Sequence, residues 1–466
     1  MIRGVTKNIN IGIGANKNSD PLEVILPQSI DRRNGKTTDA GNWKRRPGYT
    51  EKWNTGTSFP VELLIPEYGG FATAGNGKVF KIGDSPTEIT GAILTGAFKP
   101  TYTSFQPTSS QKPFLVLCDG GAPIKVGLSP VTISLLGGSP VHARFVDTVD
   151  TRVVMCGHDD LTFVWSDLEN AESYPAANFN YVLGDGDRIV FFKIEMRLLY
   201  FFKSHSIEIW SPTGSSPFFG RQHFIEKGCG APYSPVFANN KWYWYGDDGE
   251  FYSMSGISPA FISLRYRAEI DKAEAKEEMY GFHFAKEKLI RWFAPTANKC
   301  FVFDYMTETF SEDNIWSEGD WLRLPIKSYM EMNGEQYIGD YNATGKIYHW
   351  SKDYKDDNGQ PIRVFRKFAF PMADGHEARA NLLRLRVERG NGTAAVPNPD
   401  ALIRWRFDQG EYLSENYDLG QFGDHYPYID IPSLGIGREL EFEMIESDAV
   451  DSLITHAWLT AEQLGA

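Results

Sequence analysis

The sequence predicts an all-β protein: an extended N-terminal arm, a β-propeller body of about six or seven blades, and a C-terminal β-sandwich or jelly-roll domain. The first observation behind this prediction is composition, because 14% of the 466 residues are aromatic and the chain contains 44 Gly and 26 Pro. Such a mixture favours many short strands joined by turns over a helical bundle. The other two observations are a long-period repeat and a change of pattern at each end of the chain.

The repeat is a short strand-like motif that recurs at the interval of one propeller blade. Its seven copies begin at Lys78, Pro123, Leu161, Ser206, Glu250, Cys300 and Lys346, with spacings of 45, 38, 45, 44, 50 and 46 residues. Each copy follows another apolar strand and a polar turn, as in "MRLLYFFKSH" and "NKWYWYGDDG". A period near 45 residues is typical of a four-stranded blade that buries both faces against its neighbours.

Two features inside the repeat carry expectations of their own. Trp165, Trp210 and Trp350 end three of the motifs, and we expect them to pack between blades rather than to form a binding site. The segment "SLRYRAEIDKAEAKEEM", residues 263–279, has no Gly or Pro and is rich in helix-forming residues. It predicts a helix or helical turn inserted between blades.

The patterns at the two ends set the predicted domain bounds. Residues 1–55 show little apolar periodicity and predict an arm that packs along the body, whereas residues 56–360 hold the repeat and predict the propeller. Residues 361–466 alternate apolar and polar residues in segments such as "LLRLRVERG" and "ELEFEMIE", which predicts a separate β-sandwich or jelly roll. We expect the link between these domains near 355–361 or 373–378.

Charge is distributed unevenly along the chain. The formal net charge is −13, yet residues 1–53 carry ten Lys and Arg against five Asp and Glu, and residues 377–466 carry seven Arg against sixteen Asp and Glu. A basic arm on an acidic body favours self-complementary assembly or an acidic partner, and solvated surface charge is the alternative. The candidate contacts with a neighbouring subunit or an adaptor ring are Arg32, Arg33, Lys44, Arg45 and Arg46.

A second explanation for this basic arm requires no neighbouring subunit. The arm would pack on its own propeller, and Pro47 with Gly48 would form a turn into the first blade.

No sequence motif indicates catalysis. GxSxG, Walker and HExxH patterns do not occur, and the nine histidines form no metal-spaced pair, so we assign no catalytic, cofactor-binding or metal residues and expect no cofactor or enzymatic activity. "RFDQGEYLS", 406–414, is faintly similar to the aspartate-containing turn of sialidase blades, but it also fits an ordinary hairpin. "GIGANKNSD", 12–20, lacks the preceding strand and following helix of a phosphate-binding loop.

Sequence features also bear on the environment of the protein. No apolar run reaches about 18 residues, and the N-terminus lacks the apolar core of a secretory signal, so neither a membrane helix nor a signal peptide is predicted. The four cysteines, Cys118, Cys156, Cys229 and Cys300, lie far apart and predict reduced thiols.

Several segments, taken in order, resemble a known family. They are "NWKRRPGY" (42–49), "TRVVMCGHDDLTFVWSDLENAESYPAANF" (151–179), "GDRIVFFKIEMRLLYFFKSHSIEIWSPTG" (186–214), "FIEKGCGAPYSP" (224–235), "FVFDYMTETFSEDNIW" (301–316) and the terminal strands that begin "LLRLRVERGNG". The chain resembles the tail hub, or nozzle, proteins of short-tailed bacteriophages, which form a family of packaged-DNA stabilisation proteins. The specificity lies in the order of the segments and in the pair "SIEIWSPTG" and "KGCGAPYS".

The resemblance implies a structural virion protein. Members of this family form a ring, commonly of about six copies, that extends the DNA channel below the portal and adaptor rings, retains the packaged genome and anchors fibres or a spike. The implied partners are further copies of the chain, portal-adaptor (head-to-tail connector) proteins, fibre, spike or needle proteins, and genomic DNA that passes without sequence-specific binding, with no membrane contact. The implied location is the virion tail, after synthesis in the bacterial host cytoplasm.

An alternative function is a propeller-type carbohydrate-binding or carbohydrate-cleaving phage tail protein. A protein that grips DNA is a weaker interpretation, because tight binding to phosphates needs a dense basic surface and this chain is acidic.

Overall fold

The computed structural model describes most of the chain as strands. The described residues are 31–37, 43–96, 98–108, 111–138, 142–157, 161–372, 376–388, 392–421, 423, 426, 428–451 and 453–464, together with the backbone of β1 (Val5–Ile9), β2 (Ile13–Ala15) and β3 (Gln28–Ser29). Among them, β2 and β3 form a small parallel pair. None of the described helices is long and apolar enough to cross a membrane.

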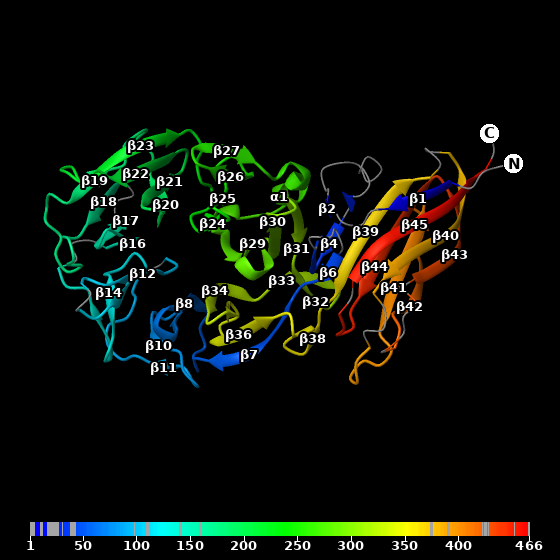
Figure 1. Cartoon of the computed structure of the whole chain (residues 1–466), viewed down its shortest axis with the longest axis horizontal. Helices are drawn as coiled ribbons and strands as arrows, with labels where there is room; N and C mark the ends of the chain where they lie inside the picture. The colour runs from blue at the N-terminus through cyan, green and yellow to red at the C-terminus, as the bar shows by residue number, and fades with distance from the viewer. Residues whose placement is uncertain are drawn as a thin grey trace.

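Seven four-stranded blades surround a central axis in the described part of the chain (Figure 1). Each of the first five is built from four consecutive strands that pair antiparallel. These blades are β8 (Val61–Ile65), β9 (Phe71–Ala74), β10 (Val79–Lys81) and β11 (Thr87–Glu88); β12 (Thr101–Phe105), β13 (Phe114–Cys118), β14 (Ile124–Leu128) and β15 (Val131–Leu135); β16 (Phe145–Val149), β17 (Arg152–Cys156), β18 (Thr162–Trp165) and β19 (Phe179–Tyr181); β20 (Ile189–Glu195), β21 (Leu198–Lys203), β22 (Ile207–Pro212) and β23 (Phe219–Ile225); β24 (Val236–Ala238), β25 (Lys241–Tyr245), β26 (Phe251–Ser255) and β27 (Ser258–Phe261).

The sixth and seventh blades depend on residues from the N-terminal part of the chain. The sixth contains β28 (Tyr280–Phe284), β29 (Leu289–Ala294), β30 (Lys299–Asp304) and β31 (Thr309–Glu312), and the hairpin β32 (Asn314–Ser317) and β33 (Asp320–Arg323) follows it. The seventh contains β34 (Ile326–Met332), β35 (Glu335–Asp340) and β36 (Lys346–Ser351), and its fourth strand is β7 (Gly48–Asn54). β7 pairs antiparallel with β36, so the two ends of the propeller are joined within one sheet.

The propeller and its repeat are therefore confirmed, and the blade number is seven. All seven predicted motifs lie on the third strand of a blade, namely β10, β14, β18, β22, β26, β30 and β36. The helical turns predicted within 263–279 are also confirmed. They are η2 (Leu264–Tyr266), α1 (Arg267–Asp271) and η3 (Lys276–Glu278), and two further turns are η1 (Glu67–Gly69) and η4 (Ala285–Glu287).

Each blade-to-blade contact buries its own apolar cluster, as expected for sheets with two apolar faces. Trp165, Trp210 and Trp350 all lie in these clusters, which confirms that they pack between blades. They do not all face the same way. Trp165 faces the following blade, whereas Trp210 faces the preceding one, so both meet around Phe163 in one cluster.

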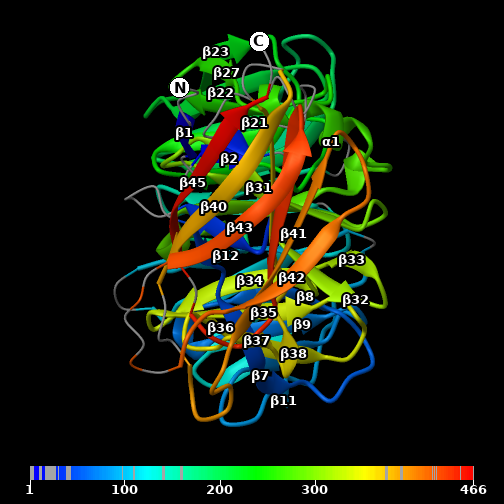
Figure 2. The same cartoon turned by 90° about the vertical axis from the view of Figure 1, so that its right-hand side faces the viewer.

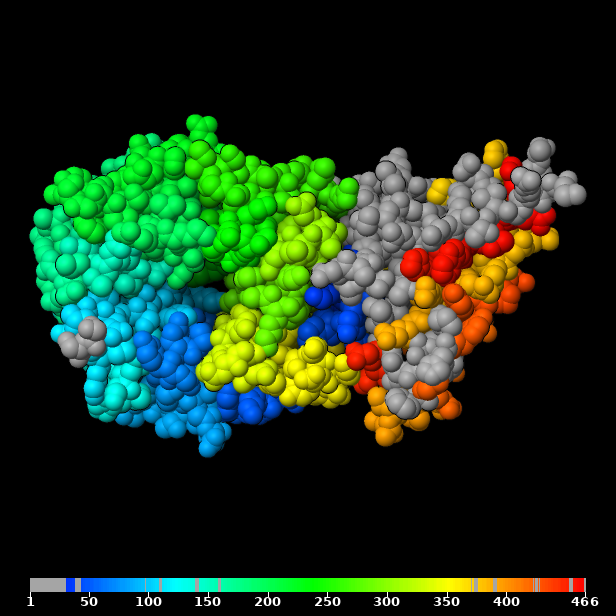
Figure 3. Space-filling model, viewed as in Figure 1, coloured from blue at the N-terminus to red at the C-terminus, as the bar shows by residue number. Residues whose placement is uncertain are grey.

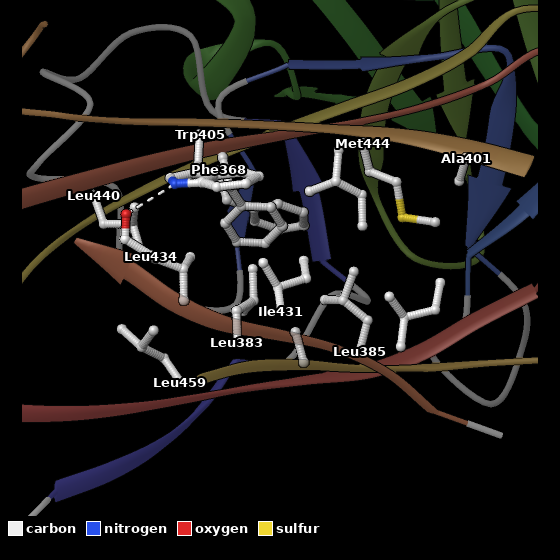
Figure 4. Packing of buried hydrophobic residues seen from close by; sticks show 14 of the residues in the cluster. Phe368, Leu383, Leu385, Ala401, Trp405, Ile431, Leu434, Leu440, Met444 and Leu459 are labelled. Carbon is white, nitrogen blue, oxygen red and sulfur yellow. Dashed lines mark hydrogen bonds between the residues drawn. The ribbon is translucent and has the colours of Figure 1, made fainter. Parts of the chain in front are cut away.

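The C-terminal domain consists of two sheets packed face to face, and its strands lie in front of the propeller in Figure 2. In one sheet the strand order is β43 (Tyr428–Gly437), β40 (Ala378–Val387), β45 (Leu453–Gln463), β6 (Trp43–Arg45) and β5 (Gly35–Thr37), with β1 also paired to β45. In the other it is β4 (Asp31–Arg33), β39 (Val364–Pro371), β44 (Glu439–Glu446), β41 (Asp400–Phe407) and β42 (Leu413–Asp418). Between them lies an apolar core around Phe368, Leu383, Trp405 and Ile431 (Figure 4).

Residues 31–54, called the N-terminal segment below, belong to both domains. β4, β5 and β6 are strands of the sandwich, and β7 is a strand of the propeller. β4 lies between β31 and β39, so one nine-stranded sheet runs from the sixth blade into the sandwich. The chain returns to the sandwich through β37 (Asp356–Asp357), which pairs with β7, and β38 (Gln360–Pro361). The predicted arm is thus, in its described part, a set of paired strands.

Candidate functional sites

The five basic residues predicted to contact a neighbouring subunit lie at the domain junction. Arg32 and Arg33 are on β4, Lys44 and Arg45 are on β6, and Arg46 follows β6 directly. Arg32, Arg45 and Arg46 are only 1%, 6% and 3% exposed, and Arg33 is partly buried. Lys44 alone among the five is exposed.

Arg46 is held by an ion pair inside the chain. Its Nη1 donates to Oδ1 of Asp357 at 2.8 Å, its Nη2 donates to the carbonyl of Asn314 at 3.2 Å, and its Nε donates to Oδ1 of Asn34 at 2.9 Å. Burial by itself would lower the pKa of Arg46, but the Asp357 carboxylate more than offsets this and raises it. Arg46 therefore joins the N-terminal segment to the link between the domains, 311 residues away in sequence.

Arg33 and Asn34 extend this junction to the sixth blade. Arg33 forms ion pairs of 3.1 Å with Glu312 and with Asp31, and its guanidinium lies 4.9 Å from the centre of the Trp321 ring. The Asn34 side-chain carbonyl also accepts a hydrogen bond of 2.7 Å from the backbone N–H of Asn314. The asparagine adopts φ +59°, a conformation that Asn tolerates better than most residues. The segments 42–49 and 301–316 thus meet through Arg46, which contacts Asn314 both directly and by way of Asn34.

Arg32 and Arg366 form a second part of the junction, where two positively charged side chains lie together. They lie directly opposite each other in the β4–β39 register, and both guanidinium groups lie near the Trp43 ring, at 4.2 and 4.9 Å from its centre. Arg32 donates to Thr37 Oγ1 at 2.8 Å, whereas no described residue accepts a hydrogen bond from any guanidinium nitrogen of Arg366. Burial and the neighbouring Arg32 lower the pKa of Arg366. Two like charges share one buried site here.

These positions favour the second explanation given above, in which the arm packs on its own chain. The heads of Arg33 and Arg46 are occupied by acidic partners of the same chain, and those of Arg32 and Arg45 are buried. Contact between Lys44 and a neighbouring subunit stays a prediction. Sequence reasoning did not find Asp357, Glu312 and Asn314, because they lie roughly 270–310 residues from their partners and no local signal links them.

The segment "KGCGAPYS" meets "SIEIWSPTG", through the cluster of Ile207, Ile209 and Cys229, and the turn just before it, between the fourth and fifth blades. Gly228 lies so close to the preceding turn that a Cβ there would be 1.9 Å from the carbonyl oxygen of Ser204. Cys229 N–H donates to the Lys203 carbonyl at 2.9 Å, and Trp244 Nε1 donates to the Gly228 carbonyl at 3.0 Å. The segment "KGCGAPYS" therefore locks one blade to the next.

A buried ionic network supports the same blade contact. The Lys203 ammonium contacts Asp185 and lies 3.2 Å from Oε1 of Glu208. Glu208 also accepts hydrogen bonds from Trp210 Nε1 at 3.1 Å and from the Gly184 backbone at 2.8 Å. The network is satisfied within the chain, which suits a structural role.

Side chains bridge the propeller at its centre. The first strands of neighbouring blades lie against one another around the axis, and Lys99 precedes one of them, β12. Its ammonium lies 4.5 and 4.3 Å from the ring centres of Tyr280 and Phe282 on β28, and it donates to the carbonyl of Lys327 at the start of β34 at 3.0 Å. Side chains of the second, sixth and seventh blades thus meet across the channel.

A cavity of about 480 Å³ lies beside this bridge, and the surface is hollowed at the centre of the propeller (Figure 3). Turns and connections of the first two blades form most of its wall, and the charged residues that line it are Glu62, Lys99, Asp119 and Lys327. Burial first, and then Lys327, lower the pKa of Lys99 to about 7, while Glu62 opposes this shift. No sequence motif marks this site, because its residues come from separate blades.

The remaining sequence candidates have ordinary positions. "RFDQGEYLS" is the hairpin between β41 and β42 in the sandwich, where Oδ1 of Asp408 accepts hydrogen bonds of 2.9 Å from the backbone of Arg438 and of Glu439. Most of "GIGANKNSD" lies outside the described residues. In the part of the chain that is described, no group of three or more His, Cys, Asp and Glu side chains is placed to hold a metal ion. All four cysteines are buried and form no disulfide with one another, in agreement with the predicted thiols.

Comparisons with known proteins give only weak structural similarities. No protein-family model and no curated protein matches the chain. Similar solved structures include the WD40 β-propeller domain of Doa1 (10% identity, TM-score 0.40, 66% of this chain and 97% of that chain). Two others are BamB from Moraxella catarrhalis (10%, 0.40, 74% and 98%) and the Neurospora crassa Pan2 WD40 domain (9%, 0.41, 66% and 95%). Because these similarities are weak, the seven blades themselves carry the assignment.

Proposed function

We propose that this protein is a structural subunit of a virion: the tail hub, or nozzle, of a short-tailed bacteriophage. The observation that carries the proposal is the ordered set of segments that resemble this family. Their positions in the fold support it, since they lie where parts of the molecule join. The segments 42–49 and 301–316 meet at the domain junction through Arg46, Asn34 and Asn314. The segments 186–214 and 224–235 meet between two blades.

In this role roughly six copies form a ring below the portal-adaptor proteins, and the ring extends the DNA channel, retains the genome and anchors fibres or a spike. The DNA path runs between copies rather than through one propeller. Lys99, Tyr280 and Lys327 support this route, because the ammonium groups of Lys99 and Lys327 lie at the Tyr280 ring and Lys99 also donates to the Lys327 carbonyl, so these residues bridge the propeller channel.

Electron microscopy of particles that contain this chain tests the proposal. The expected result is a ring of roughly six copies at the tail, directly beyond the connector. A different location, a single copy or a trimeric spike would contradict it. Cleavage of host surface polysaccharide by the purified chain would instead support the carbohydrate-active alternative.

A further inference from the structure

The cavity at the propeller centre is lined by a lysine with unused hydrogen-bond donors, a feature that a channel wall does not require. An ammonium group carries three N–H donors, and the Lys99 ammonium uses one of them on the Lys327 carbonyl. No described acidic residue forms a salt bridge with Lys99. Two aromatic rings cover one side of this ammonium, and the cavity borders its residue. Lys99 therefore has donor capacity left beside an open space.

The acidic residues of the cavity are mostly committed to other partners. Oδ2 and Oδ1 of Asp119 accept hydrogen bonds from the backbone of Gly96 and Gly121 at 2.7 and 3.0 Å, which fixes this carboxylate in its own turn. Glu62 pairs with Lys327 at 3.4 Å, a distance at the long end for a charged hydrogen bond. The cavity thus holds two carboxylates that each have partners of their own, whereas Lys99 keeps unused donors and forms no ion pair with a described carboxylate.

Nearby groups add positive charge and an apolar wall. The Arg144 guanidinium lies 4.0 Å from the centre of the Phe98 ring, which lines the cavity, and its Nε donates to the hydroxyl of Tyr233 at 3.4 Å. Phe98 is 45% exposed and gives the cavity one apolar wall.

We propose that this cavity binds a small oxyanion, carboxylate or phosphate-like, between the ammonium groups of Lys99 and Lys327. The anion offsets the repulsion between the two lysines, and the cavity of about 480 Å³ leaves room for it beside them. This site is independent of the proposed hub function, because it requires a single folded chain and no ring.

The groups that face Lys99 set the expected pH dependence. They are Glu62 on β8, Lys327 on β34 and the rings of Tyr280 and Phe282 on β28. Burial and Lys327 lower the pKa of Lys99 to about 7. Binding of an anion that stays ionised should therefore weaken as the pH rises through this value, since Lys99 loses its charge.

Titration calorimetry of the full chain with sulfate and with succinate tests the proposal, because sulfate represents phosphate-like groups and succinate represents carboxylates. We expect at least one of them to bind to the wild type, and Lys99→Met to weaken that binding by about ten-fold or more. Glu62→Gln should strengthen it, since a competing carboxylate is removed. Lys346→Met, which affects an outer pair with Glu51, is the matched control and should bind like the wild type.

Each result of the calorimetry either supports the proposal or contradicts it. Binding of only one anion identifies the ligand class. Absence of binding by either anion, or equal binding by the wild type and Lys99→Met, overturns the proposal. If Lys99→Met does not fold, Glu62→Gln decides, because unchanged affinity in that variant also overturns it.

Discussion

The seven blades close in two different ways. The first five are built from consecutive strands, so each sheet forms from a local stretch of chain. The sixth continues through β4 into the sandwich, and the seventh takes β7 from the N-terminal segment. Both groups bury apolar clusters and some charges, such as Lys203 with Glu208 in the fourth blade, but in the second group a buried ion pair, Arg46 with Asp357, joins segments that lie far apart in the chain. Local sequence thus specifies a blade, and long-range polar contacts specify how the ring and the sandwich join.

The largest expected effect on stability concerns the second group, the sixth and seventh blades. Arg46→Ala removes one partner of a fully buried ion pair and leaves the Asp357 charge without compensation, so the free energy of unfolding should fall by about 3–5 kcal/mol. Denaturant unfolding measures this, and Lys78→Ala, which removes an exposed pair with Glu88, should change stability little.

Replacing Arg45 and Arg46 with Glu should unfold the isolated chain. A stable double variant that only fails to assemble would restore the subunit-contact hypothesis.

The three motif tryptophans allow a direct comparison of the first five blades, which contain Trp165 and Trp210, with the last two, which contain Trp350. Trp350→Ala should cost about 3–5 kcal/mol, and Trp165→Ala or Trp210→Ala should cost a similar amount, because all three side chains are buried. Only Trp350 stacks on Tyr49 of β7, at 6.1 Å, and donates to Glu287 at 2.6 Å. Hydrogen exchange should therefore show loss of protection in β7 for Trp350→Ala alone. Equal loss in all three variants would mean that the seventh blade closes no differently from the others.

Replacing Arg366 should raise the stability of the protein, unlike the substitutions above, which should lower it. Arg366→Met replaces a buried charge that has no described hydrogen-bond partner by an apolar side chain of similar length, so stability should rise by about 1–3 kcal/mol. Thermal unfolding measures the change, with Arg384→Met as the control, because Arg384 is exposed and paired with Asp430. Destabilisation by Arg366→Met would show that its charge has a compensating partner in solution.

A further expected effect depends on pH and concerns Lys99, which connects the second blade to the sixth and seventh blades. Its pKa is about 7 in the folded protein and near the usual 10.5 when unfolded. The unfolded chain therefore binds more protons between these values, and stability should rise with pH across this window. Lys99→Met should remove this gain, so unfolding curves of the two proteins at several pH values should converge toward high pH. Parallel curves would place the Lys99 pKa near its unfolded value.

The sequence predicted the propeller because each blade repeats a local pattern, and all seven motifs lie on third strands. It did not predict that β7 and β4 would complete other sheets, since short strands such as "DRR" carry no periodic signal and their partners lie far away. Trp165 and Trp210 occupy similar motifs yet face opposite neighbours, a shift in register that sequence similarity alone hides. The central site was missed because Glu62, Lys99 and Lys327 are separate single residues that only the ring brings together.

The pairing of β7 with β36 in the seventh blade also sets the order in which parts of the propeller can fold during synthesis. β7 leaves the ribosome early, but its partner β36 lies at residues 346–351. At about 5–20 residues per second, translation separates the two strands by roughly 15–60 seconds. Through that interval the nascent chain can form the first five blades, while β7 presents an unpaired strand edge. The ring can close only after residue 351 of 466 has been made, so a product truncated before β36 would carry blades without a closed propeller.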